Sequence, residues 1–436
     1  MKFPKKIAQK FNEYMIRADD LNIEGWSFKF NDARSISAGL VNNYMGGPYS
    51  PPSGKTTCSG SAYIIWRDGR ISKGQITQET IENLDGALKK WKEISFTDSD
   101  APNIQEPLPM PKDLKIKDEN VNKIIKEDSS YLFEILDYYN QKLAKKENVK
   151  MLNAKAGAGF NHSTIMNSKG MVLEWEETTM FTYANINNKY SDSYYKRNAA
   201  KKKDLNTIIL EIEKNMTHSQ KKIKAKSDYM PIILMPDVLG SFLGKYLLGS
   251  NLNGMAVAHN MSLYEADDFK RKKQVFDKKL NIIIDGLEDY AIDTIPCSSM
   301  GIPSSKQYII AGGRLITPFL GLQYSNKLGM STTSQGAVKI DAGQGPFESI
   351  ISDVDYGLII YDVLGVHTQN AKDGRYSLAV SNGLVVEDGL IRGTIEQTAL
   401  ISGNFLDSLN DKETKFAEYR KGEVTMRMKG DVMAKT

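Results

Sequence analysis

Hydrophobic residues recur at strand or helix spacing along most of the chain. Residues 61–66 are largely apolar and lead into an Asp-Gly turn, which predicts a strand followed by a hairpin turn. Residues 77–91 carry apolar side chains at helical spacing after Thr77, a residue suited to cap a helix. The apolar positions of that helix are Ile81, Leu84, Leu88 and Trp91. The first hundred residues therefore predict a β-rich unit that ends in a helix.

A proline-rich segment separates this unit from a second one. Residues 101–111 contain four prolines, a density that is incompatible with a regular helix and typical of a linker. Beyond it, apolar residues recur every 3.6 residues from 121 to 143. Strand patterns then extend to about residue 183, and a lysine-rich helical stretch covers about 200–226. The pattern predicts a second domain of mixed helices and strands.

The remaining sequence changes to strands with frequent turns. Residues 229–235 predict a buried strand, and Pro236 and Asp237 open a helix with an apolar face. From about residue 293 the chain is rich in glycine, with turn signals such as Asp373-Gly374. Closely spaced turns of this kind predict a large antiparallel or barrel-like sheet.

The predicted fold class is α+β, with N-terminal and middle α/β-type domains before a large antiparallel, barrel-like C-terminal domain. The predicted parts are an N-terminal α+β domain at 1–100, a Pro-rich linker at 101–118, a middle α+β domain at 119–227, and a β-rich C-terminal domain at 228–436 with one central helix at about 237–248. The segment 46–59 has no role that the sequence indicates.

Composition narrows the functional classes. The chain has 436 residues, 41% hydrophobic and 25% charged residues, and a net charge of only +4, as in a soluble globular protein. No apolar run approaches the about 20 residues that cross a bilayer. Two cysteines, Cys58 and Cys297, exclude a disulfide framework and favour a reducing compartment. We therefore expect a cytoplasmic protein that binds neither membrane nor nucleic acid.

Two weak motifs favour ordinary structural roles. Residues 53–57 read Ser-Gly-Lys-Thr-Thr, like the end of a phosphate-binding loop, but the glycine required five positions before Gly54 is Tyr49. The lysine runs at 201–203 and 221–226 lack interleaved aromatic residues. They are more typical of a solvated surface than of a nucleic-acid site.

The histidines predict no metal site. The four histidines are far apart, and none has a second histidine within five residues. A zinc peptidase is expected to carry two histidines on one helix with a carboxylate beside the first. The sequence contains no helix of that kind.

Residues 365–389, which read GVHTQNAKDGRYSLAVSNGLVVEDG, and residues 401–407, ISGNFLD, resemble the C-terminal signature of the TldD/PmbA family. This family of peptide-maturation proteins also carries the label modulator of DNA gyrase. One branch is a zinc peptidase subunit, and the other, called TldE or PmbA, is its metal-free partner. The resemblance extends over most of the chain and is strongest from Asp293 to Asp407.

The resemblance assigns the chain to the metal-free branch. In the peptidase branch, the helix after the central buried strand carries His-Glu-x-x-x-His, and the corresponding residues here are Gly240, Ser241 and Lys245. Glycine has no side chain, serine is a poor zinc ligand, and lysine brings positive charge to a cation site. The late cysteine of the peptidase branch is also missing, because the last cysteine of this chain is Cys297.

The implied role is a non-catalytic subunit with no catalytic residue, no metal and no cofactor of its own. Zinc is expected in a TldD-like peptidase subunit, with which this chain would form a heterodimer that acts on unfolded peptides. The alternative is a free-standing homodimer that binds a peptide or another ligand without hydrolysis. A third possibility is an enzyme whose site lies near His367.

Four residues of the signature are candidates to face a peptide. They are His367, Thr368, Asn370 and Ser377. A lone histidine in a turn-rich loop is more often a hydrogen-bonding strut than a catalytic group, and we predict that role for His367.

Overall fold

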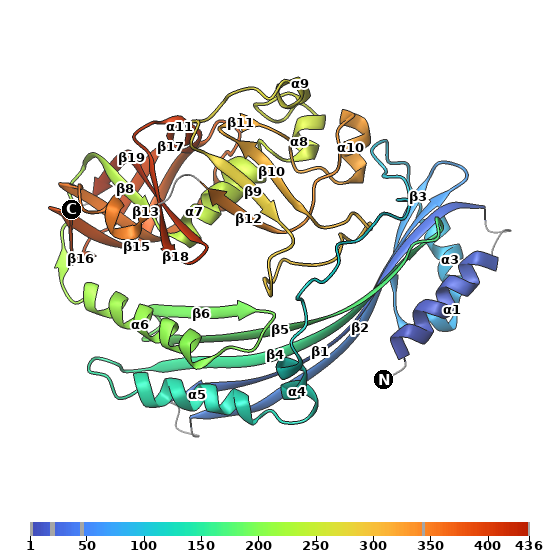
Figure 1. Cartoon of the computed structure of the whole chain (residues 1–436), viewed down its shortest axis with the longest axis horizontal. Coiled ribbons are helices and arrows are strands. Elements are labelled where there is room, and N and C mark those ends of the chain that lie inside the picture. Colours follow the sequence, from blue (N-terminus) through green and yellow to red (C-terminus); the bar gives the residue numbers. More distant parts are fainter. Residues whose placement is uncertain (1–2, 18–21, 44–47, 342–344, 435–436) are drawn as a thin grey trace. The chain divides into compact units, whose positions relative to one another are not determined.

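The chain divides into two compact units, which we describe separately (Figure 1). The computed structural model describes residues 3–17, 22–43, 48–341 and 345–434. The first unit comprises Met1–Glu213, Gly286–Ser305 and Ser334–Ala337, and the second comprises Lys214–Asp285, Lys306–Thr333 and Val338–Thr436. Mixed helices and strands, with antiparallel sheets and a barrel in the C-terminal part, confirm the predicted α+β class.

A six-stranded antiparallel sheet forms the first unit, in the order β3-β2-β1-β4-β5-β6. Its strands are β1 (Ile23–Val41), β2 (Tyr49–Trp66), β3 (Ile71–Ile76), β4 (Leu152–Asn167), β5 (Val172–Ile186) and β6 (Tyr190–Lys196). In the middle of the sheet β1 pairs with β4, with Phe28 opposite Met166. The segments 1–100 and 119–227 therefore contribute strands to one sheet, as the neighbouring blue and green strands of Figure 1 show.

Helices pack against this sheet. They are α1 (Phe3–Arg17), α2 (Gln78–Glu82), α3 (Leu84–Glu93), α4 (Glu119–Lys126), α5 (Ser130–Leu143) and α6 (Lys202–His218). The single helix predicted over 77–91 is wrong in detail, because α2 and α3 meet at Asn83, whose side chain accepts the backbone N–H of Gly86 and caps α3. The helix predicted over 200–226 ends at His218, and the residues after it include β7 (Lys222–Ile223), which pairs with β16 (Leu390–Ile395).

The proline-rich segment lies on the sheet of the first unit as extended chain. Ile104 is buried within van der Waals reach of Gly25, and the side-chain amide of Asn167 donates to the carbonyl of Gln105 at 2.8 Å. A second irregular segment, Gly286–Ser305, is held by Arg197, which donates to the carbonyls of Ala291 and Ile292 at 3.0 and 2.7 Å. These contacts fix both connecting segments to the unit.

A barrel organises the second unit. Five strands close into a ring in the order β8-β14-β15-β17-β19, with β19 returning to β8. The bounds are β8 (Asp228–Leu234), β14 (Tyr356–Leu364), β15 (Arg375–Glu387), β17 (Ala399–Asn404) and β19 (Glu423–Ala434). The pair β8 and β14 is parallel, whereas the other pairs of the ring are antiparallel. The barrel-like prediction for this region is therefore confirmed.

Shorter elements complete the second unit. The strands β13 (Gly345–Pro346), β16 (Leu390–Ile395) and β18 (Lys415–Arg420) extend the barrel sheet. A four-stranded sheet contains β9 (Asn281–Asp285), β10 (Lys306–Ala311), β11 (Arg314–Leu315) and β12 (Ala337–Asp341). The remaining helices are α7 (Pro236–Phe242), η2 (Leu243–Leu248), α8 (Gly254–Ala258), α9 (Ala266–Lys270), α10 (Leu322–Leu328), η3 (Phe347–Ile350), η4 (Val366–Thr368) and α11 (Phe405–Asn410).

An aromatic cluster anchors α7 to the barrel. The ring of Phe242 lies 5.4 Å from Tyr246, 5.0 Å from Tyr376 and 5.3 Å from Phe405, measured between ring centroids. All four side chains are buried, and such edge-to-face contacts add to the stabilisation from burial. The apolar face of α7 that the sequence predicted is therefore held against the barrel, and its other face is left free.

Two sequence features lie in ordinary structural settings. Residues 53–57, which resemble the end of a phosphate-binding loop, lie inside β2, so their N–H groups do not converge on one point. The segment 46–59 also belongs to β2 from Tyr49 onward, and its residues 46 and 47 lie outside the described residues. In the part of the chain that the structure describes, no helix combines the length and apolar character needed to cross a bilayer.

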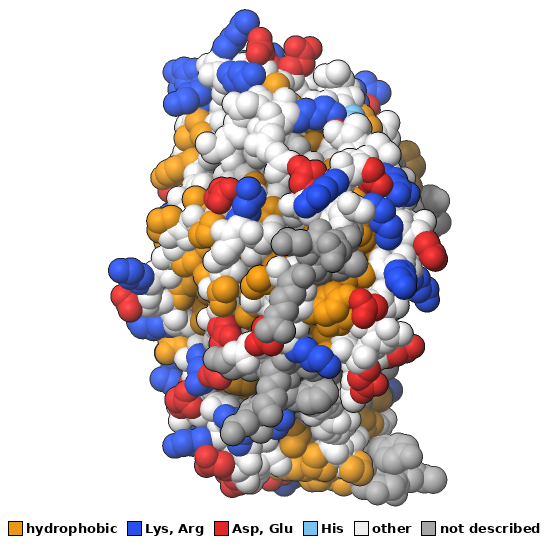
Figure 2. Space-filling model, turned by 90° about the vertical axis from the view of Figure 1, so that its right-hand side faces the viewer, with side chains coloured by type: hydrophobic (Ala, Val, Ile, Leu, Met, Phe, Trp, Pro, Cys, Tyr) orange, Lys and Arg blue, Asp and Glu red, His pale blue; other side chains and the backbone are white. Residues whose placement is uncertain are grey.

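Basic and acidic side chains are intermingled on the surface drawn in Figure 2. Blue and red groups alternate there between patches of hydrophobic side chains. Opposite charges so close together largely cancel at a distance, in line with the small net charge of +4.

Candidate functional site

The helix α7 begins directly after the central barrel strand β8. Pro236 occupies its first turn, where a missing N–H has no cost, and Asp237 adds a carboxylate at the positive end of the helix dipole. Val238, Leu239 and Phe242 are buried, whereas Gly240 and Ser241 are exposed. The exposed face of α7 is therefore poor in side-chain bulk.

At Leu243 the helix continues as the π-helix η2. Hydrogen bonds in a π-helix run between residues five apart, as from Gly249 N–H to Gly244 O at 2.8 Å. The wider turn brings residues that are five apart closer to a common face than a regular α-helix does. Gly240 and Lys245, which stand five positions apart, flank this transition. Local π-helices are frequent at functional sites.

A cleft of about 490 Å³ runs between this helix and the end of strand β14, and we call it the α7 cleft. The helix contributes Asp237, Val238, Ser241, Gly244 and Lys245, and the strand and its following loop contribute residues 361–367. Its volume lies within the usual range of ligand sites. The α7 cleft is therefore large enough to hold a few residues of an extended chain.

The strand side of the cleft is a free sheet edge. β8 pairs with β14 only as far as Ile360, and Met235 N–H donates to Ile360 O at 3.1 Å before the chain turns into α7. Residues 362–364 pair with β15 on their other side, but no described strand pairs with them on the α7 side. Backbone groups at such an edge can pair with an added strand.

A lysine links the two walls. The ammonium of Lys245 donates to the backbone carbonyl of His367 at 3.0 Å. The loop that carries His367 starts at Gly365, whose φ of 96° lies in the left-handed region that glycine adopts readily. The contact uses the carbonyl of His367, so the imidazole takes no part in it.

The other candidate residues lie outside the α7 cleft. Thr368 donates its hydroxyl to Gly365 O at 2.8 Å, which tightens the loop, and the Asn370 side chain accepts Lys372 N–H at 3.3 Å. Ser377 is exposed on β15. Of the residues that the sequence singled out, the cleft lining contains Ser241, Lys245 and His367, and it does not contain Gly240, Thr368, Asn370 or Ser377.

The three residues that the sequence resemblance aligns with the family zinc motif do not fit a zinc ion. Gly240 has no donor, the Ser241 hydroxyl donates to Asp237 O at 2.9 Å, and the Lys245 ammonium has no lone pair to offer. Zinc in proteins takes thiolate, imidazole or carboxylate ligands, and these positions supply none. Within the described ranges, His, Cys, Asp and Glu side chains form no group of three that could hold a metal.

The cysteines do not supply a reactive thiol at this site. Cys58 is exposed on β2, and Cys297 is buried in the first unit beside Ile165 and Met171. Burial raises the pKa of the Cys297 thiol to about 11, so it stays protonated near neutral pH.

Sequence reasoning missed part of the cleft. Asp237 was interpreted from the sequence only as a residue that opens a helix, and its carboxylate in the first turn could have marked it as a site candidate. Asp362 and Leu364 carry no signal, because only the end of the β8 pairing exposes the edge on which they lie.

Comparison with known proteins finds a family match in the C-terminal part of the chain. Residues 227–427 match the family model described as PmbA/TldA metallopeptidase C-terminal domain. A protein of Saccharolobus solfataricus named zinc metalloprotease TldD homolog is 22% identical over 222 residues, which is 48% of each chain. Matches to two curated relatives span 65% and 48% of the length of those proteins.

Solved structures share the fold of the whole chain. TldE from Thermococcus kodakarensis superposes with a TM-score of 0.78 at 15% identity, over 97% of this chain and 100% of the other. A protein of Bacteroides thetaiotaomicron assigned as a modulator of DNA gyrase superposes with a TM-score of 0.81 at 16% identity, over 99% of both chains. At such low identity the likeness establishes the fold alone.

Proposed function

The chain belongs to the TldD/PmbA family, and from that premise we propose that it is a TldE/PmbA-like subunit without hydrolytic activity of its own. Its partner is a TldD-like subunit that carries the zinc. The observation that supports this role is the α7 cleft, whose lining includes Ser241 and Lys245, two of the three residues that the resemblance aligns with the zinc motif. The lysine is already bonded to the opposite wall.

An extended, unfolded peptide suits the α7 cleft. The free edge at residues 362–364 offers backbone donors and acceptors to a strand of any sequence, which is how β-strand addition gives affinity without side-chain specificity. The proposed contribution of this subunit is to confine peptide near the zinc of its partner. Its two cysteines are free, which suits action in a reducing, cytoplasmic setting.

The deciding experiment is reconstitution with a TldD-like subunit that carries His-Glu-x-x-x-His. The two chains are purified separately and together, and each sample is analysed for zinc, for oligomeric state and for cleavage of an unfolded peptide. We expect one complex, with zinc and activity only where the TldD-like chain is present. Stoichiometric zinc together with hydrolysis in this chain alone would refute the proposed role. Self-association and peptide binding without any complex would instead favour the homodimeric binding protein.

A gain-of-site variant tests the zinc-motif positions directly. A Cβ added at Gly240 meets no atom within 4 Å, so the position has room for a side chain. The triple variant Gly240→His, Ser241→Glu, Lys245→His is expected to bind zinc more tightly in an equilibrium titration than a matched triple alanine variant, because two imidazoles can share one ion. Equal zinc affinity in both variants would show that these positions do not converge on one point.

His367→Ala separates a structural from a catalytic role. The side chain is exposed, and the contact to Lys245 is made by the backbone carbonyl, so assembly and peptide turnover in the complex are expected to stay within about twofold of the parent, a change of under about 0.5 kcal/mol. A loss of turnover with assembly intact would make His367 a participant in the reaction.

A further inference from the structure

A second cavity lies at the opposite end of the barrel strands, and we call it the barrel-end pocket. It has a volume of about 630 Å³ and is formed by the first residues of β8, residues 427–429 of β19, residues 353–356, and the turn after α11. The α7 cleft begins where β8 ends, seven residues from Asp228. At about 3.3 Å per residue the two sites are about 20 Å apart, so the barrel-end pocket is a separate site.

The floor of the barrel-end pocket is apolar. Met230, Val354 and Met428 line it, and each is at most 4% exposed. Pro231 adds a fourth apolar surface beside them. Methionine side chains adapt to the shape of an apolar group, so this floor suits an aliphatic chain.

Every cation that lines the barrel-end pocket already contacts an acidic group. Arg427 and Lys415 both bind the carboxylate of Asp353, with Lys415 Nζ at 2.5 Å. Lys429 Nζ lies 2.7 Å from Glu413. Lys226 Nζ lies 3.7 Å from Glu387 and 4.1 Å from the centroid of the Tyr356 ring. An anion entering the pocket would have to displace these carboxylates.

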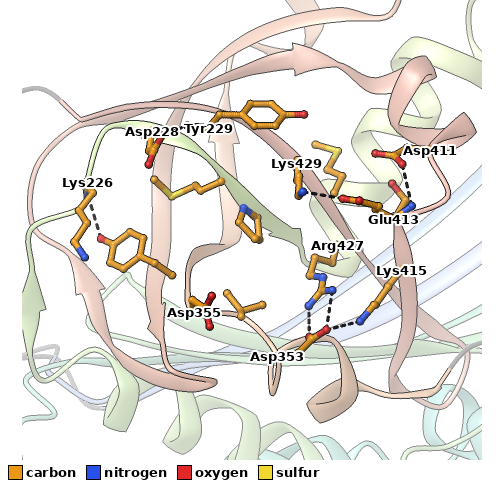
Figure 3. A pocket seen from close by; sticks show the side chains of 16 residues that line it. Lys226, Asp228, Tyr229, Asp353, Asp355, Asp411, Glu413, Lys415, Arg427 and Lys429 are labelled. Atoms are coloured by element: carbon orange, nitrogen blue, oxygen red, sulfur yellow. Dashed lines mark hydrogen bonds and ion pairs between the residues drawn. The ribbon is translucent and has the colours of Figure 1, made fainter.

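Two carboxylates of the same pocket, Asp228 and Asp355, have no ion-pair partner among the described residues. Asp228 accepts one backbone N–H, from Tyr229 at 2.8 Å, and that bond leaves its charge uncompensated. Asp411 differs, because its charge helps to raise the pKa of Lys429. In Figure 3, Asp228 and Asp355 lie on one side of the pocket together with Lys226, whose ammonium pairs with Glu387, and Arg427, Lys415, Lys429 and Glu413 lie on the other side.

An apolar floor beside uncompensated carboxylates selects one ligand chemistry. We propose that the barrel-end pocket binds an aliphatic chain that ends in an ammonium or guanidinium group. The chain lies on the methionine floor, and its cation sits on the side of Asp228 and Asp355. A lysine or arginine side chain of a polypeptide and a free polyamine share this chemistry. The site lies within one unit, so its binding does not require a partner subunit.

Isothermal titration of the full chain tests the assignment with three probes. The probes are the peptide acetyl-Ala-Ala-Lys-Ala-Ala-amide, the same peptide with norleucine in place of lysine, and spermidine. The lysine peptide is expected to bind at least about tenfold more tightly than the norleucine peptide, and raising the salt concentration should weaken it. Tighter binding of spermidine than of the peptide would identify a free polyamine as the source. Equal binding of the lysine and norleucine peptides overturns the proposal.

Variants that are expected to change the binding affinity in opposite directions locate the site. Asp228→Asn and Asp355→Asn should each weaken binding of the favoured probe by about tenfold, because each removes one attracting charge. Lys429→Gln leaves Glu413 unpaired and should tighten binding by several fold, a gain that misfolding cannot produce. Asp267→Asn on α9, exposed and outside the pocket, is the matched control and should change nothing. Unchanged affinity in Asp228→Asn and Asp355→Asn would place the cation elsewhere.

Discussion

Tyr376 gives the sharpest test of packing inside the barrel. Its side chain is 3% exposed, and its hydroxyl is buried without a hydrogen-bond partner in the structure. Burial also raises the pKa of this tyrosine well above its usual value. A buried hydroxyl without a partner loses its hydration and gains nothing in return, at a cost of about 1–3 kcal/mol. Tyr376→Phe keeps the ring and removes that hydroxyl.

We expect Tyr376→Phe to raise the free energy of unfolding by about 1 kcal/mol, the lower end of that range, because the lost oxygen leaves a small void. For a unit of about 200 residues this corresponds to a rise in Tm of about 2–4 °C. Urea and thermal unfolding of the full chain measure both quantities. Tyr246→Phe removes another buried hydroxyl without a partner and should stabilise by a similar amount.

A second substitution makes the reasoning specific to one contact. A Cβ added at Gly430 would lie 2.8 Å from the Tyr376 hydroxyl, closer than packed atoms tolerate. Gly430→Ala should therefore destabilise the parent by about 1–3 kcal/mol and the Tyr376→Phe protein by about 1 kcal/mol less. The remaining cost comes from Ile232 and from the carbonyl of Ser402, which the added Cβ would also meet.

The same double-mutant cycle with Tyr246→Phe is the control and should show no coupling. Two results would refute the reasoning. Loss of stability in Tyr376→Phe would mean that the hydroxyl has a partner such as a buried water. An equal loss of stability from Gly430→Ala in the parent and in Tyr376→Phe would mean that the Tyr376 hydroxyl is not the atom that the added Cβ meets.

Three further predictions follow from single contacts. Arg197→Met should lower the free energy of unfolding by about 2–4 kcal/mol in urea denaturation, because it removes the partner of the partly buried Glu177 carboxylate and of two backbone carbonyls. A loss below about 1 kcal/mol would contradict the anchoring role. Arg427 and Lys415 hold the pKa of Asp353 well below its usual value of about 3.9. The ion pairs therefore contribute fully to the free energy of unfolding above about pH 4, and that contribution disappears as the pH falls through the lowered pKa. Asp353→Asn should therefore have a lower Tm than the parent at pH 7, and the two Tm values should converge in strong acid. A difference in Tm that stays constant at all pH values would contradict this pH dependence. Lys245→Met should cost about 0.5–1.5 kcal/mol through the lost bond across the α7 cleft, measured by the same urea denaturation, whereas no loss would show that the exposed bond is replaced by water.

Much of the second unit was accessible from local patterns. The apolar run at 229–235 and the helix predicted at about 237–248 correspond to β8 and to the continuous pair α7 and η2. Buried strands and amphipathic helices impose their spacing on neighbouring residues, and that spacing is visible without any partner. The change to a π-helix at Leu243 was not visible, because a hydrogen-bond shift of one residue leaves the apolar spacing almost unaltered.

The sequence could not show that residues 1–100 and 119–227, which were predicted as separate domains, contribute strands to one sheet. The Pro-rich segment at 101–118 reads as a linker, yet β1 and β4 on its two sides pair along fifteen residues. Strand pairing depends on which backbones meet, and residues more than a hundred positions apart leave no trace of it in local spacing.

By itself, the sequence determined the α+β class, the positions of most strands and helices and the resemblance to the TldD/PmbA family, and it led to the prediction that Gly240, Ser241 and Lys245 replace the zinc motif. These depend on residue identity and on near neighbours. Tertiary structure alone decided the closure of the five-stranded ring, the free edge at 362–364 and the unbalanced charge of the barrel-end pocket. It also brought Lys245 to His367, 122 residues away. The physical reason is that clefts and charge balance arise between segments that meet only after the backbone has closed its long-range hydrogen bonds.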